Sequence, residues 1–142
     1  MNQLDGIYFE DLTVGRSAVF SKTITDADVT LFAGVSGDTN PVHLDADYAG
    51  QTMFKGRIAH GMLSASLIST VFGTRLPGPG AIYISQTLKF KAPVKIGDTA
   101  VARVEVIELL AEKKRATFKT TVSVGATVVV DGEAVLMVPS RG

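Results

Sequence analysis

The second half of the chain alternates apolar and polar residues with a period of two, the pattern of half-buried β-strands. The segment 82–91 places four apolar residues on one face and mostly polar residues on the other, with Gln86 as the odd polar residue on the apolar face. Segments 99–108 and 115–124 repeat the alternation. The apolar positions are Ile82, Ile84, Leu88 and Phe90 in the first segment, Ala102, Val104 and Val106 in the second, and Ala116, Phe118 and Val122 in the third.

A fourth strand is predicted at 127–138, with a bulge or bend at Asp131-Gly132. A weaker alternation at 17–24 predicts one early strand. The pattern therefore predicts four long antiparallel strands preceded by one short strand.

The run from His60 to Gly73 differs in kind, because it is apolar or small on every side and carries no full charge. Gly73 is a suitable helix end, since Pro77 and Pro79 follow shortly after it. A helix of this length spans roughly 20 Å, too short for a bilayer, and a helix without a polar face must be surrounded by protein. We expect a central buried helix with the sheet wrapped around it, hence an α+β domain.

Two shorter helices are predicted before it. Thr25 is a candidate N-cap, followed by acids at Asp26 and Asp28, and opens a helix that ends near Gly34. A second brief helix is expected at 45–49. Neither is long enough to be stable alone.

Composition limits the remaining classes. The chain has 142 residues, 14 basic and 14 acidic, and no cysteine. We predict one domain over 1–142, with no charge excess that would favour nucleic acid or an anionic membrane. Without cysteine, neither disulfides nor thiolate chemistry is available. The N-terminal segment has neither a basic start nor an apolar core, and no apolar run approaches a membrane span, so we expect a cytoplasmic protein.

Candidate chemistry concentrates in the segment 32–62, which contains both histidines of the chain. Asp38 and His43 lie five residues apart, across an Asn40-Pro41 pair that forbids a continuous helix. The turn at Pro41 can bring the carboxylate and the imidazole together, and such a pair can hold one water molecule and exchange protons with it. We assign the two as a unit, and Asn40 and Pro41 as scaffold.

The start of the buried helix supplies a third group. Gly61 would present a free backbone N–H at the positive end of the helix dipole, with no side chain to block an approaching carbonyl oxygen. A glycine at a crowded helix start also has a purely structural explanation. For His60 we expect a capping or supporting role rather than catalysis.

Other motifs are incomplete. A calcium loop starting at Asp38 would have Ala49 at its twelfth position, where a glutamate is required. Ser36 lacks the strand-turn-helix context of a serine nucleophile.

A zinc site is equally incomplete. It would combine Asp45 with His43 and His60, which are 17 positions apart and do not share one helix face. We predict no metal ion.

Three segments resemble the MaoC-type (R)-specific enoyl-CoA hydratases: GDTNPVH at 37–43, AHGM at 59–62 and FKAPVKIGD at 90–98. The resemblance covers most of the chain. It implies a hot-dog fold, with Asp38 and His43 as the catalytic acid and base pair and the amide of Gly61 as the oxyanion hole for the thioester carbonyl. It also implies a homodimer with an acyl tunnel at the subunit interface, and no cofactor, because coenzyme A belongs to the substrate.

The predicted function is the reversible addition of water to trans-2-enoyl-CoA, giving (R)-3-hydroxyacyl-CoA. The alternatives are a 3-hydroxyacyl-acyl-carrier-protein dehydratase, a hot-dog acyl-CoA thioesterase and a non-catalytic acyl-CoA-binding protein. The chain length of the acyl group, the direction and the pathway stay open. Five basic residues were weighed for the coenzyme phosphates and none is assigned: Lys55, Arg57, Lys89, Lys91 and Lys95.

Overall fold

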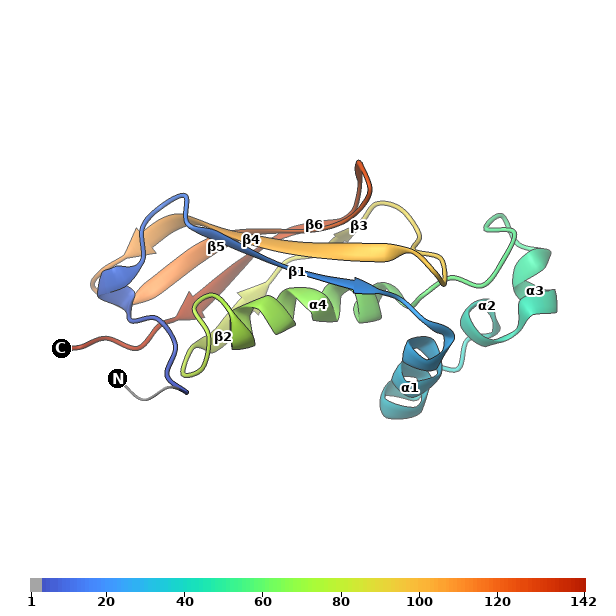
Figure 1. Ribbon diagram of the computed structural model, residues 1–142, viewed down its shortest axis with the longest axis horizontal. Coiled ribbons are helices and arrows are strands. Elements are labelled where there is room, and N and C mark those ends of the chain that lie inside the picture. The colour runs from blue at the N-terminus through green and yellow to red at the C-terminus, as the bar shows by residue number, and fades with distance from the viewer. Residues whose placement is uncertain (1–3) are drawn as a thin grey trace.

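Six antiparallel strands form one sheet in the computed structural model, which describes residues 4–142 of the predicted 1–142 domain and leaves 1–3 outside (Figure 1). The strand order is β1-β4-β5-β6-β2, with β3 paired to β6 beside β2. The strands are β1 (Ser17–Thr23), β2 (Ile82–Gln86), β3 (Lys89–Phe90), β4 (Thr99–Leu110), β5 (Arg115–Val124) and β6 (Thr127–Met137).

The predicted alternation is confirmed in the central strands. Ala102, Val104 and Val106 of β4 are fully buried, and so are Ala116, Phe118 and Val122 of β5. These side chains point to the side of the sheet that carries the long helix, because strand residues two apart share a face. The core therefore lies between the sheet and one helix.

The predicted strand at 82–91 is split into β2 and β3, and the predicted faces are wrong for Ile82, Tyr83 and Ile84. Tyr83, expected on the polar face, packs edge-on against the ring of Phe72 with centroids 5.2 Å apart. Ile82 and Ile84 are 52% and 42% exposed. The reason is a register shift between Tyr83 and Ser85 in the pairing of β2 with β6, which an alternation count cannot detect.

Gln86 does face inward, as predicted. Its Nε2 donates to Oγ1 of the buried Thr120 on β5 at 2.8 Å, and it also donates to the carbonyl of Thr87. A polar residue on an apolar face is thus satisfied by a second polar residue across the sheet.

The predicted bulge at Asp131-Gly132 is wrong. Both residues pair with β5 in regular register, and the irregularity lies at Val129, two residues before Asp131. Gly132 has a different role: a Cβ there would lie 1.8 Å from the carbonyl oxygen of Thr87, where the chain crosses between β2 and β3. Only glycine leaves room for that crossing.

The helices are η1 (Phe9–Asp11), α1 (Asp26–Ser36), α2 (Pro41–Leu44), α3 (Ala46–Gly50) and α4 (Gly61–Thr74). Thr25 caps α1 through a reciprocal capping box with Asp28, as the sequence suggested. The helix continues beyond the predicted end at Gly34 and stops at Gly37, whose φ of 79° is the left-handed conformation that terminates helices.

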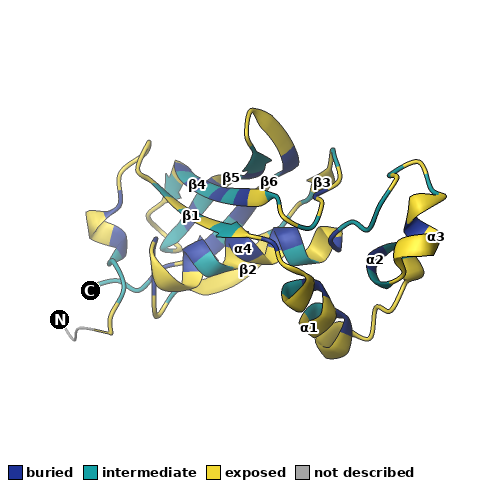
Figure 2. Ribbon diagram, turned by 45° about the vertical axis from the view of Figure 1, so that its right-hand side comes forward, coloured by how far each residue is buried: buried dark blue, intermediate teal, exposed yellow. Residues whose placement is uncertain are grey.

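Helix α4 packs against β4, β1 and β5, with its buried residues facing the sheet. The expectation that the whole helix is covered does not hold within one chain, because Met62, Ser66, Ser69 and Gly73 form an exposed stripe. These four residues are here called the α4 stripe, and within residues 4–142 all of them are exposed; Figure 2 shows exposed positions on α4.

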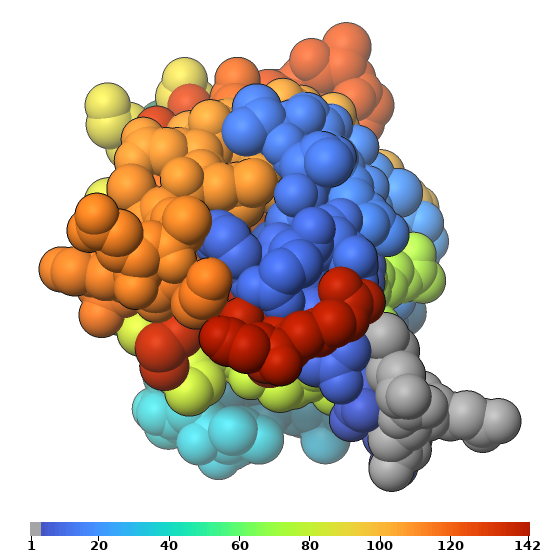
Figure 3. Space-filling model, turned by 90° about the vertical axis from the view of Figure 1, so that its left-hand side faces the viewer, coloured from blue at the N-terminus to red at the C-terminus, as the bar shows by residue number. Residues whose placement is uncertain are grey.

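The two ends of the described chain lie together at one end of the sheet, where the red C-terminal segment runs beside the blue N-terminal segment (Figure 3). The N–H of Phe9 donates to the carbonyl of Pro139 at 2.7 Å. Arg141 binds Asp11, and its own N–H donates to Glu10. None of the helices in residues 4–142 is long and apolar enough to cross a membrane.

Candidate active site

The predicted site residues meet where α1, α2 and α3 adjoin the start of α4, beyond one end of the sheet (Figure 1). They line a cavity of about 590 Å³. Its walls are Asp38, His43, Met53, Phe54, Ile58, Ala59, His60, Gly61, Met62, Ser64, Phe90, Lys91, Ala92, Pro93, Val94 and Val130. The site therefore combines a few polar groups with a largely apolar wall, as binding sites for small molecules do.

Asp38 lies in the loop between α1 and α2. The left-handed Gly37 turns the chain out of α1, and the N–H of Asp38 donates to Oγ of Ser36 at 3.1 Å. Its own Oδ1 accepts from the N–H of Asn40 at 3.2 Å, which fixes the carboxylate in a local turn. The second oxygen, Oδ2, is left for other partners.

His43 is held by the short helix α2, which Pro41 starts rather than breaks. Asn40 caps this helix by accepting from the N–H of Val42 at 3.1 Å, and proline fits the first helical position because its missing N–H is not needed there. The imidazole is 8% exposed, and its Nδ1 lies 2.8 Å from the carbonyl oxygen of Ile58. Since a carbonyl can only accept, Nδ1 carries the proton in the neutral ring and Nε2 keeps its lone pair.

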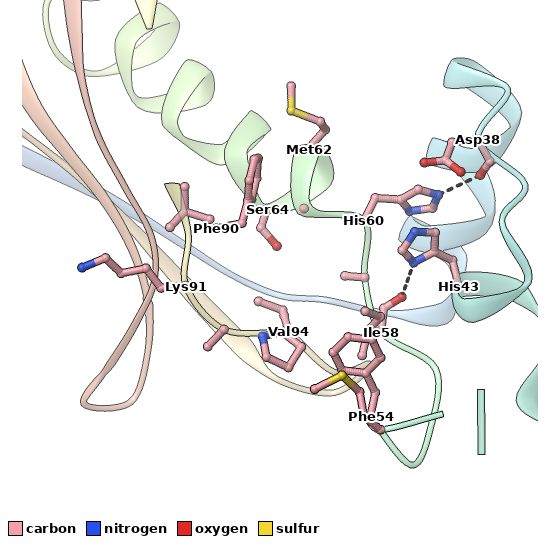
Figure 4. A pocket seen from close by; sticks show the side chains of 16 residues that line it. Asp38, His43, Phe54, Ile58, His60, Met62, Ser64, Phe90, Lys91 and Val94 are labelled. Carbon is pink, nitrogen blue, oxygen red and sulfur yellow. Dashed lines mark hydrogen bonds between the residues drawn. The ribbon is translucent and has the colours of Figure 1, made fainter. Parts of the chain in front are cut away.

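The structure thus brings Asp38 and His43 together, as predicted, and adds His60 to them. Their ligand-type atoms all lie within 4.8 Å of one another. Figure 4 shows the two imidazoles stacked, with the Asp38 segment above and Ile58 below. The ring centroids are 3.9 Å apart and the planes are inclined by 27°.

The same three residues have the chemical types of a zinc site, with two histidines and one acid. The stacking is unsuited to a shared ion, because imidazole lone pairs lie in the ring planes and a common metal requires them to converge. One nitrogen of each ring also faces a backbone carbonyl. A metal-free site remains our prediction.

Gly61 begins α4, so its N–H and that of Met62 have no intrahelical acceptor. A Cβ at Gly61 would lie 2.8 Å from the ring of Phe90, so glycine is required here for packing as well. The structural explanation and the functional one therefore both apply at this position.

Arg57 is a supporting residue that the sequence did not reveal, since it was weighed only as a phosphate ligand. Its Nε donates to the carbonyl of His43 at 2.6 Å, and its other end pairs with Asp26 at 2.8 Å. The guanidinium thus links α2 to α1, and these two contacts use the hydrogen-bond donors that a phosphate would need. Nothing local in the sequence marks this role.

Among the described residues that wall the cavity, Lys91 is the one lysine or arginine. Its Nζ lies 3.7 Å from the carboxylate of Asp131, a half-exposed pair that contributes little to stability.

A second cavity of about 540 Å³ lies along α4, and Met62 lines both cavities. It is bounded by residues of the α4 stripe and by β2. Burial raises the pKa of Tyr83 to about 12, so its hydroxyl stays protonated and donates to Oε1 of Gln86. The wall of this cavity is otherwise mostly apolar or small.

The family model described as the MaoC-like domain matches residues 11–134, nearly the whole chain. The chain belongs to the MaoC-like family. Among curated members, an (R)-specific enoyl-CoA hydratase of Rhodospirillum rubrum is 62% identical over 95% of this chain and 94% of its own. A 3-hydroxybutyryl-CoA dehydratase of Methylorubrum extorquens is 54% identical over 98% and 88%.

Among solved structures, the unliganded R-hydratase PhaJ1 of Pseudomonas aeruginosa superposes with a TM-score of 0.91 at 51% identity, covering 96% of this chain and 88% of that one. The sheet and α4 therefore form the hot-dog fold expected from the sequence, and the α+β class is confirmed.

Proposed function

We propose that this chain catalyses the reversible hydration of trans-2-enoyl-CoA to (R)-3-hydroxyacyl-CoA. The observation that carries the proposal is the convergence of the Asp38 carboxylate and the His43 imidazole in one cavity, next to the start of α4. The named activities of the relatives support the reaction and its (R) stereochemistry.

Asp38 and His43 bind the water molecule and transfer its proton. Asp38 keeps Oδ2 free and His43 keeps the Nε2 lone pair, so both can accept hydrogen bonds from one water molecule. The pair removes one proton as the water oxygen bonds to C3, and returns one proton to C2. The proton count balances, and the reverse order gives dehydration.

The start of α4 stabilises the negative charge that develops on the thioester oxygen. As water adds to C3, negative charge develops on the thioester oxygen, and the reaction is faster if fixed donors meet it there. The N–H of Gly61, at the positive end of a 14-residue helix, is such a donor. Without a side chain, Gly61 also lets the carbonyl oxygen approach closely.

The functional unit in this proposal is a homodimer. Strand β2 is an edge of the sheet with Ile82 and Ile84 exposed, and Ile84 lines the second cavity together with residues of the α4 stripe. An exposed apolar edge strand is a template for pairing with another chain, and a second copy would cover both features by twofold symmetry. The second cavity would then be closed by the partner and could receive the acyl chain.

The experiment that tests the reaction is to mix the protein with crotonyl-CoA and follow the loss of the conjugated enoyl thioester absorbance. The product is then offered to dehydrogenases of opposite stereospecificity, and free thiol is measured in parallel. Absorbance loss with an (R) product and no thiol is the expected result.

Two outcomes would overturn the proposal. Release of free thiol would indicate a thioesterase. Unchanged crotonyl-CoA with folded protein would exclude hydration of this acyl-CoA, and the same assay with crotonyl-acyl-carrier protein would then separate a carrier-protein dehydratase from a non-catalytic binder.

A further inference from the structure

His60 is buried in the site, yet it takes part in no step of the proposed reaction. It is 2% exposed and occupies the N-cap position of α4, where its side chain caps nothing in its own helix. Instead its Nε2 lies 2.9 Å from the backbone carbonyl oxygen of Asp38, 22 residues earlier in the chain. Figure 4 shows the ring reaching across to the Asp38 segment.

Two other aromatic rings also contact the His60 ring. His43 stacks on it at 3.9 Å, and the ring of Phe32 in α1 packs against it at 4.9 Å, inclined by 53°. A side chain held by one hydrogen bond and two ring contacts has few rotamers available. His60 therefore connects α1, the Asp38 loop, α2 and the start of α4.

The contacts also determine which nitrogen carries the proton. The carbonyl of Asp38 only accepts, so Nε2 donates and Nδ1 has the lone pair in the neutral ring. Nδ1 is buried and has no hydrogen-bond partner among the described residues. His60 is one of the cavity walls, but its Nε2 is taken by the Asp38 carbonyl and its Nδ1 is buried, so the ring is poorly placed to exchange protons with substrate.

We propose that His60 is a positioning residue, acting through its hydrogen bond to the Asp38 carbonyl, that holds the catalytic carboxylate in register with His43 and the Gly61 amide. This inference rests on the proposed hydration. It assigns a role in catalysis to a residue outside the pair that transfers the protons.

The test compares two substitutions in the full-length protein. His60→Phe keeps a stacking ring without the donor, whereas the amide nitrogen of His60→Gln can reach the position of Nε2 and restore the bond. We expect His60→Phe to lower kcat at least about tenfold with KM for crotonyl-CoA little changed, since small misplacements of catalytic groups cost that much or more. His60→Gln should recover most of the loss.

Ile68→Val provides the matched control. Ile68 is fully buried in the same helix and away from the cavity, so this change should lower the melting temperature without lowering kcat. Wild-type kcat in His60→Phe, or equal losses in the Phe and Gln variants, would overturn the proposal.

A double-mutant cycle tests whether His60 acts through Asp38. In an Asp38→Asn background there is no carboxylate to position, so His60→Phe should cause little further loss. The same fold-loss in both backgrounds would mean an independent role and would contradict the proposal.

If the variants do not fold, the His60 hydrogen bond can still be tested in the wild-type protein. Long-range ¹H–¹⁵N spectra should show the His60 proton on Nε2 and the His43 proton on Nδ1. A His60 ring without a proton on Nε2 would exclude the hydrogen bond. Failure of the hydration itself would appear separately, as a wild-type protein that does not turn over crotonyl-CoA.

Discussion

At the scale of single residues, Asp38 and His43 are expected to carry the proton transfers. Asp38→Asn and His43→Gln should each lower kcat at least about a hundredfold, the usual contribution of a general acid or base, while the fold remains intact. The measurement is turnover of crotonyl-CoA, with circular dichroism to check folding. Asp47→Asn is a matched control, because Asp47 is an exposed acid of α3 outside the cavity. Near-normal turnover in either folded site variant would reject the paired-site mechanism.

Gly61 has two explanations, and a pair of variants can separate them. Gly61→Ala should lower both stability and turnover, because its Cβ would meet the Phe90 ring at 2.8 Å. Adding Phe90→Ala removes the clash. The double variant should regain stability relative to Gly61→Ala. Alanine keeps the backbone N–H, but its methyl group would obstruct the thioester oxygen. If the oxygen must approach this amide, kcat should therefore stay well below that of Phe90→Ala. Turnover equal to that of Phe90→Ala would reduce Gly61 to a packing residue.

How much of the site the sequence predicts depends on chain distance. Asp38 and His43 were found together because five residues and a proline-containing turn separate them. A supporting role was expected for His60, but the contacts of Arg57 and His60 were not predicted, because they span 14 and 22 residues and depend on how α1 and α4 pack. A lone histidine at a helix start gives no sign of which distant carbonyl it meets.

At the scale of elements, the capping box of α1 predicts how the free energy of unfolding depends on pH. Partial burial acts to raise the pKa of Asp28, but hydrogen bonds from Thr25 and the nearby Lys22 ammonium outweigh it and hold that pKa below its usual range. A depressed folded pKa stabilises the native state above the unfolded pKa, and this contribution is lost as acid protonates the group. Asp28→Ala should therefore lower the free energy of unfolding by about 1 kcal/mol at neutral pH.

Denaturant titrations of both proteins at decreasing pH provide the check. The difference between wild type and Asp28→Ala should shrink toward zero as the pH falls through the folded pKa of Asp28. A difference that is constant across the acid range would show that the carboxylate charge plays no part in the cap.

The central strands and the helices α1 and α3 were predictable because each follows from a local rule of alternation or capping. The two errors, the faces of β2 and the bulge at Asp131-Gly132, both concern strand register. β2 is an edge strand whose ladder slips between Tyr83 and Ser85, and Gly132 accommodates the neighbouring Thr87 rather than a bulge of its own. Register is a property of paired strands, so a single segment does not specify it.

At the scale of the whole molecule, β2 leaves Ile82 and Ile84 exposed, and Ile84 lines the second cavity with residues of the α4 stripe. The sequence predicted a helix without a polar face and therefore surrounded by protein, whereas one chain covers only the side that faces the sheet. A helix with charge-free residues on every side and an edge strand with exposed isoleucines are consistent with each other if a second copy completes the enclosure. The second cavity then belongs to the dimer rather than to one chain.

Ile84→Glu tests this arrangement directly. Placing a carboxylate on each copy at a twofold interface buries two like charges, so the variant should sediment as a monomer or show a dissociation constant raised at least about a hundredfold. Turnover of crotonyl-CoA should fall with the dimer population, because Met62, which lines both cavities, lies in the α4 stripe that a second copy would cover in the proposed dimer. Val14→Glu is the control, since Val14 is even more exposed but precedes β1, on the opposite edge of the sheet. An Ile84→Glu protein that remains dimeric would place the interface elsewhere, and a fully active monomer would show that the site is complete within one chain.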